Sequence, residues 1–344
     1  MKFFKITSLY LIISFFIFQS SGFAFQTTGR QYAISGKTMG TFYTIKFISH
    51  KSESLSLWEE KVDTLLKEVN RKLSMFDAKS EISLFNKKAT GKLVTISPEF
   101  YAVILTGKKL YRMTNGAWDA SVKPLVDLWG FGTENSTNKI PDPGKIAVAL
   151  SKVGFNHIAI KGTNAVQKTK PITLDFGSIA KGYGVDAVAK LFTSSGINDV
   201  LVEIGGELYA SGKNRKGKYW SVGISKPDKI YINQGLYKII RLDNKAIATS
   251  GNYRNFFEIK GKTFSHIIDP KTGFPVDNGI VSASVISQNC TFADGLATAL
   301  MVMDLKKGIR LVNSLEDTEC LIIQKKGQKL LNHASKNFGD LVVK

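Results

Sequence analysis

Two oxygen-bearing side chains interrupt an apolar helix pattern near the end of the chain. In TFADGLATALMVMD, residues 291–304, apolar residues recur at helical spacing and predict a buried helix. Asp294 and Thr298 stand four residues apart, so they share one face of that helix. A carboxylate and a hydroxyl one turn apart can give two hard oxygen ligands to a cation such as Mg²⁺. The alternative is that Asp294 is an N-cap and that the Thr298 hydroxyl bonds to the preceding turn.

The segment TLDFGSIAKGYGVD, residues 173–186, combines an acid, glycines and a lysine at a predicted strand-to-helix junction. A short strand ends at Asp175, and the chain passes Gly177 and Ser178 before the helix begins. Free N–H groups at a helix start attract anions, and Lys181 would lie in the first turn beside a bound phosphate. The GxxxxGK[ST] spacing of a Walker loop is absent, and an ordinary capped helix is the alternative interpretation.

Two further stretches place polar groups at turns. Trp118 and Asp119 follow Gly116, and an exposed aromatic beside an acid suits a planar, polar heterocycle. A core tryptophan with an N-capping aspartate is the alternative. His266, one of four histidines, lies in a predicted strand just before the turn DPKTG, residues 269–273. An imidazole titrates near neutral pH and can act as a general base, although a lone histidine in a strand is more often structural.

These side chains need a scaffold of mixed helices and strands. Apolar residues at helical spacing predict helices at 55–76, 98–114 and 179–196, and a short one after PDPG (141–144). Alternating or β-rich runs predict strands at 40–48, 199–212, 219–225 and 245–251, and hairpins at 256–269, turning at Gly261–Lys262, and at 318–332. Strands clustered after helices favour an α+β fold over regular βαβ winding. No linker rich in Pro, Gly or Ser interrupts the chain, so residues 25–344 are expected to form one catalytic domain.

The first 24 residues, 1–24, have the pattern of a secretory signal peptide. Lys2 and Lys5 precede an apolar run, and the small residues that follow suit cleavage after Ala24. The apolar run is about half of the ~20 residues that a spanning helix needs, and an uncleaved membrane anchor is the alternative. An exported protein could oxidise Cys290 and Cys320 to a disulfide, but buried free thiols are equally compatible with their apolar neighbours.

The chain is strongly basic. Its formal net charge is +19, with 43% hydrophobic and 22% charged residues. The first 24 residues hold two of the lysines and no acid, so the remaining chain carries +17. The basic residues are spread thinly and do not alternate with aromatics, so nucleic-acid binding is not expected. A basic surface of this kind favours anionic substrates or membrane-bound partners.

Eight stretches resemble, in this order, the exported FAD:protein FMN transferases of the ApbE family. They are KTMGTFYTI, SMFDAKSEISLFN, GAWDASVKPLVDLWGFG, TLDFGSIAKGYGVDAVA, VEIGGELYASG, ATSGNYRNFF, SHIIDPKTGFPV and TFADGLATALMVM. The resemblance spans residues 30–340, nearly the whole chain beyond the signal segment. An ordered set of motifs is far more specific than any one of them alone.

The resemblance implies an α+β fold of the tunnelling-fold type, with two lobes around a flavin site. It also implies a reaction in which Mg²⁺ is the cofactor and FAD the substrate: the FMN half is transferred to a Thr or Ser hydroxyl of a target protein as a phosphoester, and AMP is released. The implied acceptors are exported subunits of sodium-pumping NADH:quinone reductases or Rnf-type complexes. The implied location is the periplasm, and association with the inner membrane stays open. An FAD pyrophosphatase that uses water, and an exported flavin-binding carrier, are the alternative functions.

The resemblance also assigns roles position by position. The implied metal ligands are two side chains of the late helix, a backbone carbonyl in the strand-to-helix turn, and an alanine that offers only its backbone: Asp294, Thr298, Ser178 and Ala297. The positions implied to contact FAD are Met39, Met75, Ala117, Trp118, Asp119, Asp175, Lys181 and Ile268. His266 matches the residue proposed to accept the proton of the target hydroxyl. Trp118 stands where many relatives have a smaller aromatic, and its indole is expected to offer a stacking face.

Overall fold

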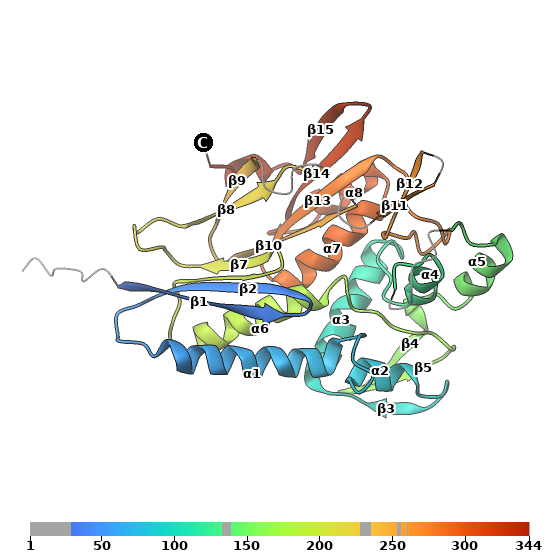
Figure 1. The fold of residues 1–344 in the computed structure, drawn as a ribbon, viewed down its shortest axis with the longest axis horizontal. Helices are drawn as coiled ribbons and strands as arrows, with labels where there is room; N and C mark the ends of the chain where they lie inside the picture. Colours follow the sequence, from blue (N-terminus) through green and yellow to red (C-terminus); the bar gives the residue numbers. More distant parts are fainter. Residues whose placement is uncertain (1–28, 133–138, 228–234, 253–255, 260, 344) are drawn as a thin grey trace, which may run out of the picture.

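One antiparallel sheet of eight strands runs through the structure, a computed structural model that describes residues 29–132, 139–227, 235–252, 256–259 and 261–343. The strands lie in the order β1-β2-β6-β7-β10-β13-β14-β15, and neighbouring strands are antiparallel (Figure 1). Their bounds are β1 Arg30–Thr38, β2 Thr41–Ser49, β6 Val200–Ile204, β7 Glu207–Ser211, β10 Lys245–Gly251, β13 Ile280–Ser287, β14 Glu319–Lys326 and β15 Lys329–Ala334. Strands from both ends of the chain therefore share one sheet.

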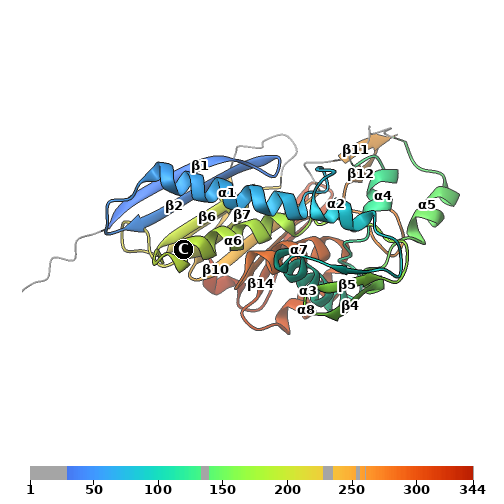
Figure 2. The ribbon, with the colours of Figure 1, turned by 90° about the horizontal axis from the view of Figure 1, so that it is seen from below.

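The two faces of this sheet bury different side chains, as the period of two in a strand requires. In β10, Ala246 and Ala248 join the core on one face, whereas Ile247 joins a second core on the other face. The first face is covered by three helices that Figure 2 shows against the strands: α1 (Leu55–Leu73), α6 (Ala180–Ser194) and α7 (Cys290–Val302). The second face is covered by the ribbon of β8 (Trp220–Ser225) and β9 (Leu236–Leu242) and by the 3₁₀ turn η2 (Phe338–Leu341).

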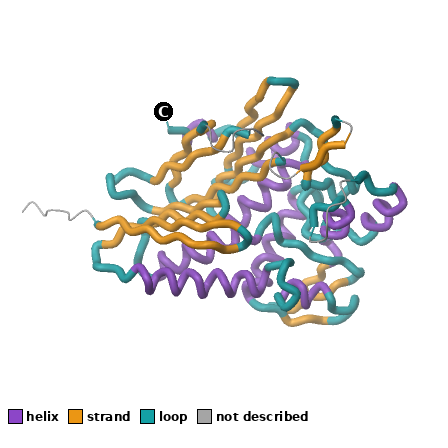
Figure 3. The backbone as a smooth tube through the Cα atoms, viewed as in Figure 1, coloured by secondary structure: helices purple, strands orange, loops and turns teal. Residues whose placement is uncertain are grey.

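Further helices and a small sheet extend the helical layer (Figure 3). The helix α3 (Pro98–Met113) packs against α7, and α8 (Leu305–Asn313) packs against β14. The small sheet has the order β3 (Leu93–Thr95), β5 (Ala165–Lys168), β4 (Ile158–Gly162), and the 3₁₀ turn η1 (Phe155–His157) joins it to α3. The short helix α2 (Glu81–Asn86) follows α1 and contacts it.

A separate set of buried side chains, here called the satellite cluster, lies beside this layer. It is formed by α4 (Lys123–Leu128), α5 (Pro143–Leu150) and the hairpin β11 (Phe256–Ile259)–β12 (Lys262–Ser265). Its buried members are Leu125, Trp129, Ile146, Ala149, Phe257, Phe264 and Ile268. The indole N–H of Trp129 donates to the carbonyl of Gly273 at 2.8 Å, which ties the DPKTG turn to this cluster.

The α+β expectation is confirmed, and the predicted elements are present with shifted ends. The helices predicted over 55–76, 98–114 and 179–196 span 55–73, 98–113 and 180–194. The predicted strand 199–212 is two strands, β6 and β7, separated by the Gly205–Gly206 turn. The hairpin predicted at 256–269 turns one residue earlier than expected, and its second strand ends at Ser265. His266 therefore follows the strand, and the prediction that it lies within the strand is wrong.

Three remaining expectations concern export. Nowhere in the described part of the chain is a helix both long and apolar enough to cross a membrane. Cys290 and Cys320 are both buried free thiols, so the structure contains no disulfide between them. The predicted signal segment 1–24 lies outside the described residues.

Candidate active site

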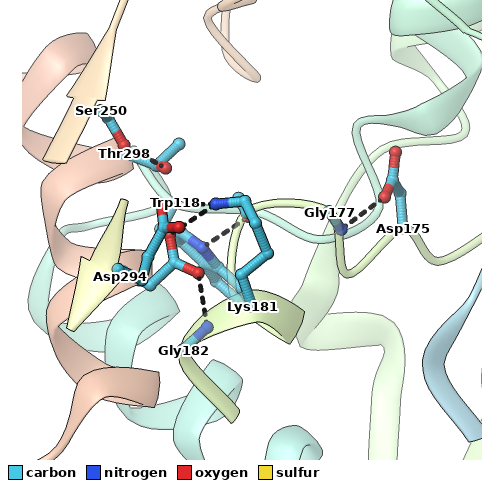
Figure 4. Close-up of polar contacts among 10 residues, drawn as sticks. Trp118, Asp175, Gly177, Lys181, Gly182, Ser250, Asp294 and Thr298 are labelled. Atoms are coloured by element: carbon cyan, nitrogen blue, oxygen red, sulfur yellow. Dashed lines mark hydrogen bonds and ion pairs between the residues drawn. The ribbon is translucent and has the colours of Figure 1, made fainter. Parts of the chain in front are cut away.

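Asp294 lies in the interior of α7 rather than at its start. The N-cap of α7 is Asn289, whose side chain accepts the N–H of Phe292, so the alternative of an N-capping Asp294 is wrong. Asp294 is only 3% exposed, and its Oδ2 accepts the backbone N–H of Gly182 in α6 at 3.0 Å (Figure 4). A carboxylate that is buried between two helices is unusual unless it is paired or binds a metal, which makes this position a candidate for chemistry.

Thr298 lies one turn further along α7 and contacts the sheet. Its hydroxyl and that of Ser250 in β10 are 2.9 Å apart, so the hydroxyl bonds across to a strand and not to the preceding helical turn (Figure 4). Ala297 is fully buried in the interior of α7. Inside a helix, the backbone carbonyl of a residue accepts the N–H of the residue four positions later. Ala297 has no other ligand atom, so the geometry gives no support to it as a metal ligand.

Close packing of α6 against α7 brings these groups together. A Cβ atom at Gly182 would lie 2.4 Å from the carbonyl oxygen of Cys290, so only glycine fits there. Asp186, one turn further along α6, accepts the N–H groups of Cys290 and Thr291 at 2.7 and 2.8 Å. Asp186 thereby satisfies free N–H groups in the first turn of α7 and fixes the axial position of the two helices.

Lys181 lies in the first turn of α6 between two buried carboxylates. Its Nζ donates to Oε1 of Glu207, the first residue of β7, and lies 4.0 Å from Oδ1 of Asp294. Burial opposes the charge on Lys181, but Asp294 and Glu207 outweigh burial and raise its pKa. Burial is also the main reason that the pKa of Glu207 rises to about 7. Lys181 therefore remains a cation at neutral pH.

The strand-to-helix turn before α6 contacts Trp118. The indole N–H of Trp118 donates to the hydroxyl of Ser178 at 3.1 Å, and the ring is only 1% exposed (Figure 4). The prediction of an exposed aromatic with a stacking face is wrong, because the larger indole fills the core against Phe155. Half-buried Asp175 accepts the N–H of Gly177 at 2.7 Å, which shapes the same turn.

Asp119 is a buried carboxylate held by local donors. It accepts hydrogen bonds from the backbone N–H and hydroxyl of Ser121 and from the N–H of Phe155. Burial raises the pKa of Asp119, although these hydrogen bonds act in the opposite direction. The N-cap of the nearby α4 is Val122, without a side-chain bond, so Asp119 is not the predicted helix cap. Its bonds instead join the loop after α3 to the start of η1.

The two methionines implied to line the flavin lie on neighbouring turns. Met39 occupies the β1–β2 turn with φ +48°, and its methyl group lies 2.8 Å from where a Cβ would stand on Gly184 in α6. Met75 lies in the loop directly after α1. Asn70 near the end of α1 donates to the hydroxyl of Thr38 at 3.1 Å, so the two turns lie side by side.

Of the remaining implied positions, two lie in or beside the satellite cluster and one lies in the turn before Trp118. Ala117 is buried in the turn before Trp118, and buried Ile268 pairs with Pro275 across the DPKTG turn. His266 is half-buried, and its ring meets the edge of Phe131 with centroids 6.4 Å apart. His266 thus stands on the side of the satellite cluster, whereas Asp294 stands on the helix that covers the main sheet.

The donor set around Asp294 fits Mg²⁺. It consists of hard oxygens, and Oδ1 of Asp294 lies beyond hydrogen-bond distance from its neighbour Lys181. No group of three or more His, Cys, Asp or Glu side chains suited to a metal occurs among the described residues. A cation held here would therefore depend on hydroxyl, carbonyl and phosphate oxygens beside Asp294, which is the usual situation for Mg²⁺ bound with a nucleotide.

Sequence reasoning missed two residues of this site. Glu207 stands in the motif VEIGGELYASG, where the available signal was an acid directly after two glycines. The structure shows that this acid is buried. Asp186 lies ten residues before the end of the predicted helix 179–196, and no spacing rule connects it to residue 290. Both depend on contacts between segments that are far apart in the chain.

Comparisons with known proteins show which family this chain is similar to. The ApbE family model matches residues 39–322. An FAD:protein FMN transferase of Vibrio cholerae serotype O1 is 39% identical over 310 residues, which is 90% of this chain and 92% of that protein. A protein of the same name from Haemophilus influenzae is 37% identical over 299 residues, 85% of this chain and 86% of that protein.

Solved structures give the same result. The flavin transferase ApbE from Vibrio cholerae matches with a TM-score of 0.83 at 37% identity, covering 91% of this chain and 99% of that one. The apo form of the flavinyl transferase ApbE from Pseudomonas stutzeri matches with a TM-score of 0.83 at 32% identity, covering 91% and 97%. Fold and relatives together place the chain among the flavin transferases. It belongs to the ApbE family, whose model covers most of its length.

Proposed function

We propose that this chain uses Mg²⁺ to transfer the FMN half of FAD to a Thr or Ser hydroxyl of a target protein, with release of AMP. The relatives are named for FMN transfer from FAD to protein; the metal, the phosphoester bond and AMP are the finer parts of the proposal. The observation that supports it best is the buried Asp294 carboxylate, one turn from Thr298 and facing the first turn of α6.

The main obstacle to this reaction is negative charge on the pyrophosphate oxygens. When bound, Mg²⁺ would neutralise part of that charge, held by Asp294, Thr298 and the carbonyl of Ser178. Lys181 adds a fixed positive charge in the first turn of α6. The N-terminal end of α6 adds the positive end of its helix dipole. These groups are part of the folded scaffold, so they need little reorganisation when charge develops.

The acceptor hydroxyl must lose a proton as it attacks. We assign this proton to the imidazole of His266, which stands directly before the DPKTG turn. The hydroxyl oxygen forms a bond to the phosphorus of the FMN half, the bond between that phosphorus and the bridging oxygen breaks, and AMP leaves with the electron pair. A positioned base of this kind contributes about 10²–10⁴-fold to the rate.

Export and the acceptor class also belong to the proposal. The N-terminal pattern of residues 1–24 supports a periplasmic protein, with exported subunits of sodium-pumping NADH:quinone reductases or Rnf-type complexes as acceptors. Mass spectrometry of the periplasmic fraction should find a chain that begins at Phe25. A chain that retains residues 1–24 and sediments with membranes would instead show an uncleaved anchor.

The function is tested by co-expressing candidate acceptors with this enzyme and measuring their intact mass. The wild type should add one FMN by a phosphoester bond when Mg²⁺ is present, and EDTA should stop the reaction. Asp294→Ala should abolish transfer. Full transfer by Asp294→Ala in chelator would contradict the metal site. Release of FMN and AMP without modified acceptor would favour the pyrophosphatase, and bound FAD without any turnover would favour the carrier.

The proposed base is tested separately with His266→Ala. The rate of single-turnover transfer should fall by about 10²-fold or more, because a base acts in the transition state. FAD affinity and melting temperature should change little. If His266 had a purely structural role, its replacement would lower FAD affinity and melting temperature together. Transfer near the wild-type rate at saturating FAD would place the base elsewhere.

A further inference from the structure

The buried cluster around Asp294 contains one carboxylate more than the proposed metal site uses. Glu207 is 3% exposed and is held in the core at the start of β7. Its Oε1 accepts from Nζ of Lys181, whereas its Oε2 is buried and has no hydrogen-bond partner among the described residues. A half-satisfied buried carboxylate is unfavourable for folding, so stability alone does not explain it.

The turn before β7 directs Lys181 toward Glu207. Gly205 has φ +59°, and a Cβ placed on it would lie 3.4 Å from Cδ of Lys181, so the lysine stem passes over this turn. The ammonium thereby reaches Glu207 and stays 4.0 Å from Oδ1 of Asp294. Oδ2 of Asp294 is occupied by the N–H of Gly182, which leaves Oδ1 as the oxygen that can accept a cation.

We propose that Glu207 is a positioning residue that holds the Lys181 ammonium away from Asp294 and so leaves Oδ1 of Asp294 for Mg²⁺. This inference rests on the metal site proposed above. Without Glu207, the ammonium can move from 4.0 Å into direct contact with Asp294 and compete with the cation. When Glu207 is ionised, the three side chains carry a net charge of −1, and a divalent cation changes it to +1, which suits a pyrophosphate.

The test is calorimetric titration of MgCl₂ into the FAD-saturated Glu207→Gln variant, which keeps the shape of the side chain and removes its charge, with the FAD-saturated wild type measured in parallel. The dissociation constant for Mg²⁺ should rise by about tenfold or more, within the range found when partners of metal ligands are replaced. The double variant Glu207→Gln/Lys181→Met removes the competing ammonium as well, so it should bind Mg²⁺ more tightly than Glu207→Gln. Lys181→Met alone should bind Mg²⁺ more tightly than the wild type, and it provides the test if Glu207→Gln does not fold.

The matched control is Asp317→Asn, which breaks an exposed Lys–carboxylate pair with Lys245 and should leave Mg²⁺ binding unchanged. A dissociation constant for Glu207→Gln within about twofold of wild type would overturn the proposal, because replacing a group that positions a metal ligand usually weakens metal binding by about tenfold or more. Equal Mg²⁺ binding by the double and the single variant would also overturn it, since the lysine would not be the competitor. A wild type that does not bind Mg²⁺ at all would refute the metal site itself, and the role of Glu207 with it.

Discussion

The hydroxyl pair of Thr298 and Ser250 illustrates how a single contact prepares the proposed site. Either oxygen can donate across their 2.9 Å separation. A Thr298 oxygen that faces a cation must direct its proton elsewhere, and Ser250 in β10 is the acceptor within reach. The strand thus orients the helix hydroxyl, as groups behind a metal ligand usually do.

Thr298→Val should therefore lower the rate of FMN transfer at fixed MgCl₂ by about tenfold or more, because it removes a ligand oxygen but keeps the shape. Thr298→Ser should retain most of the activity. Thr249→Val is the matched control, since Thr249 forms an equivalent hydroxyl pair with Ser284 at 2.8 Å on the neighbouring position of the same strand. A Thr298→Val enzyme as fast as Thr249→Val would exclude the hydroxyl from the site.

The two thiols should be unreactive in the folded protein. Burial raises the pKa of Cys290 well above its usual range and that of Cys320 to about 12, and only the thiolate is nucleophilic. Iodoacetamide should label neither residue in the native state at about pH 8 or about pH 10, and should label both after denaturation. Peptide mass mapping distinguishes the two sites.

The raised pKa of Cys320 should make the stability of the protein depend on pH in the alkaline range. An unfolded thiol ionises near pH ~8.5, whereas folded Cys320 keeps its proton up to about 12, so the folded state binds more protons in between. Stability therefore falls as pH rises through this window. Cys320→Ala should lose less stability than the wild type between about pH 8 and about pH 10, measured by urea unfolding. An identical loss in both proteins, or rapid native labelling of Cys320, would show that the thiol is accessible.

The sequence could predict which side chains carry chemistry better than it could predict their surroundings. Asp294 and Thr298 stand out because a fixed helical spacing places them on one face. Trp118 was expected to be exposed, yet its burial depends on Phe155 and Ser178, which are distant in the chain. Glu207 was missed for the same reason, since its partner Lys181 is on another element.

At the scale of elements, the α6–α7 contact determines the geometry of the site. Gly182 lets the helices approach, and its N–H binds Asp294, while Asp186 binds the start of α7. A small shift between these helices would separate Lys181 from Asp294. The carboxylate is therefore positioned by two helices together, and α7 alone does not fix it.

Gly182→Ala should destabilise the protein by about 1–3 kcal/mol, the usual cost of overpacking, because its Cβ meets the backbone of Cys290. Mg²⁺ binding should weaken as well, since the helices move apart at Asp294. Urea unfolding and calorimetric titration measure the two effects. Gly339→Ala is the control, because Gly339 has open space around its Cβ position. Wild-type stability in Gly182→Ala would show that the helix contact is loose.

The main elements could be predicted because their patterns are local. The apolar stripe of helix α1 predicted its N-terminus at the right residue, and in the structure Ser54 caps that start. Strands β1, β9 and β13 were not predicted, although β13 is almost entirely buried. The order of strands in the sheet was not predicted either, because pairing such as β2 with β6 joins residues that are more than a hundred positions apart.

At the scale of the whole molecule, the main sheet and the satellite cluster are two different kinds of core. The sheet joins strands from both ends of the chain and has a core on each face. The satellite cluster has few buried members and carries the hairpin that precedes His266. The proposed base and the proposed metal ligands therefore belong to parts that we expect to differ in stability, because the base side has the smaller core to resist local opening.

Three of the four tryptophans allow this difference to be measured. Trp58 stacks on Phe192 in the core beneath the sheet, Trp220 lies in the core on the opposite face, and Trp129 lies in the satellite cluster. In protein labelled with 5-fluorotryptophan, ¹⁹F resonances can be followed through a urea titration and assigned with single Trp→Phe variants.

Trp58 and Trp220 should lose their native resonances at one urea concentration, because strands of the same sheet separate their two cores and must unfold with both. Trp129 should lose its native resonance at lower urea, since fewer buried contacts hold the satellite cluster. FAD with Mg²⁺ should bring the Trp129 midpoint closer to the other two, because a ligand that bridges both sides stabilises the weaker one. A single midpoint for all three tryptophans without ligand would show that the side carrying His266 is as firmly held as the sheet.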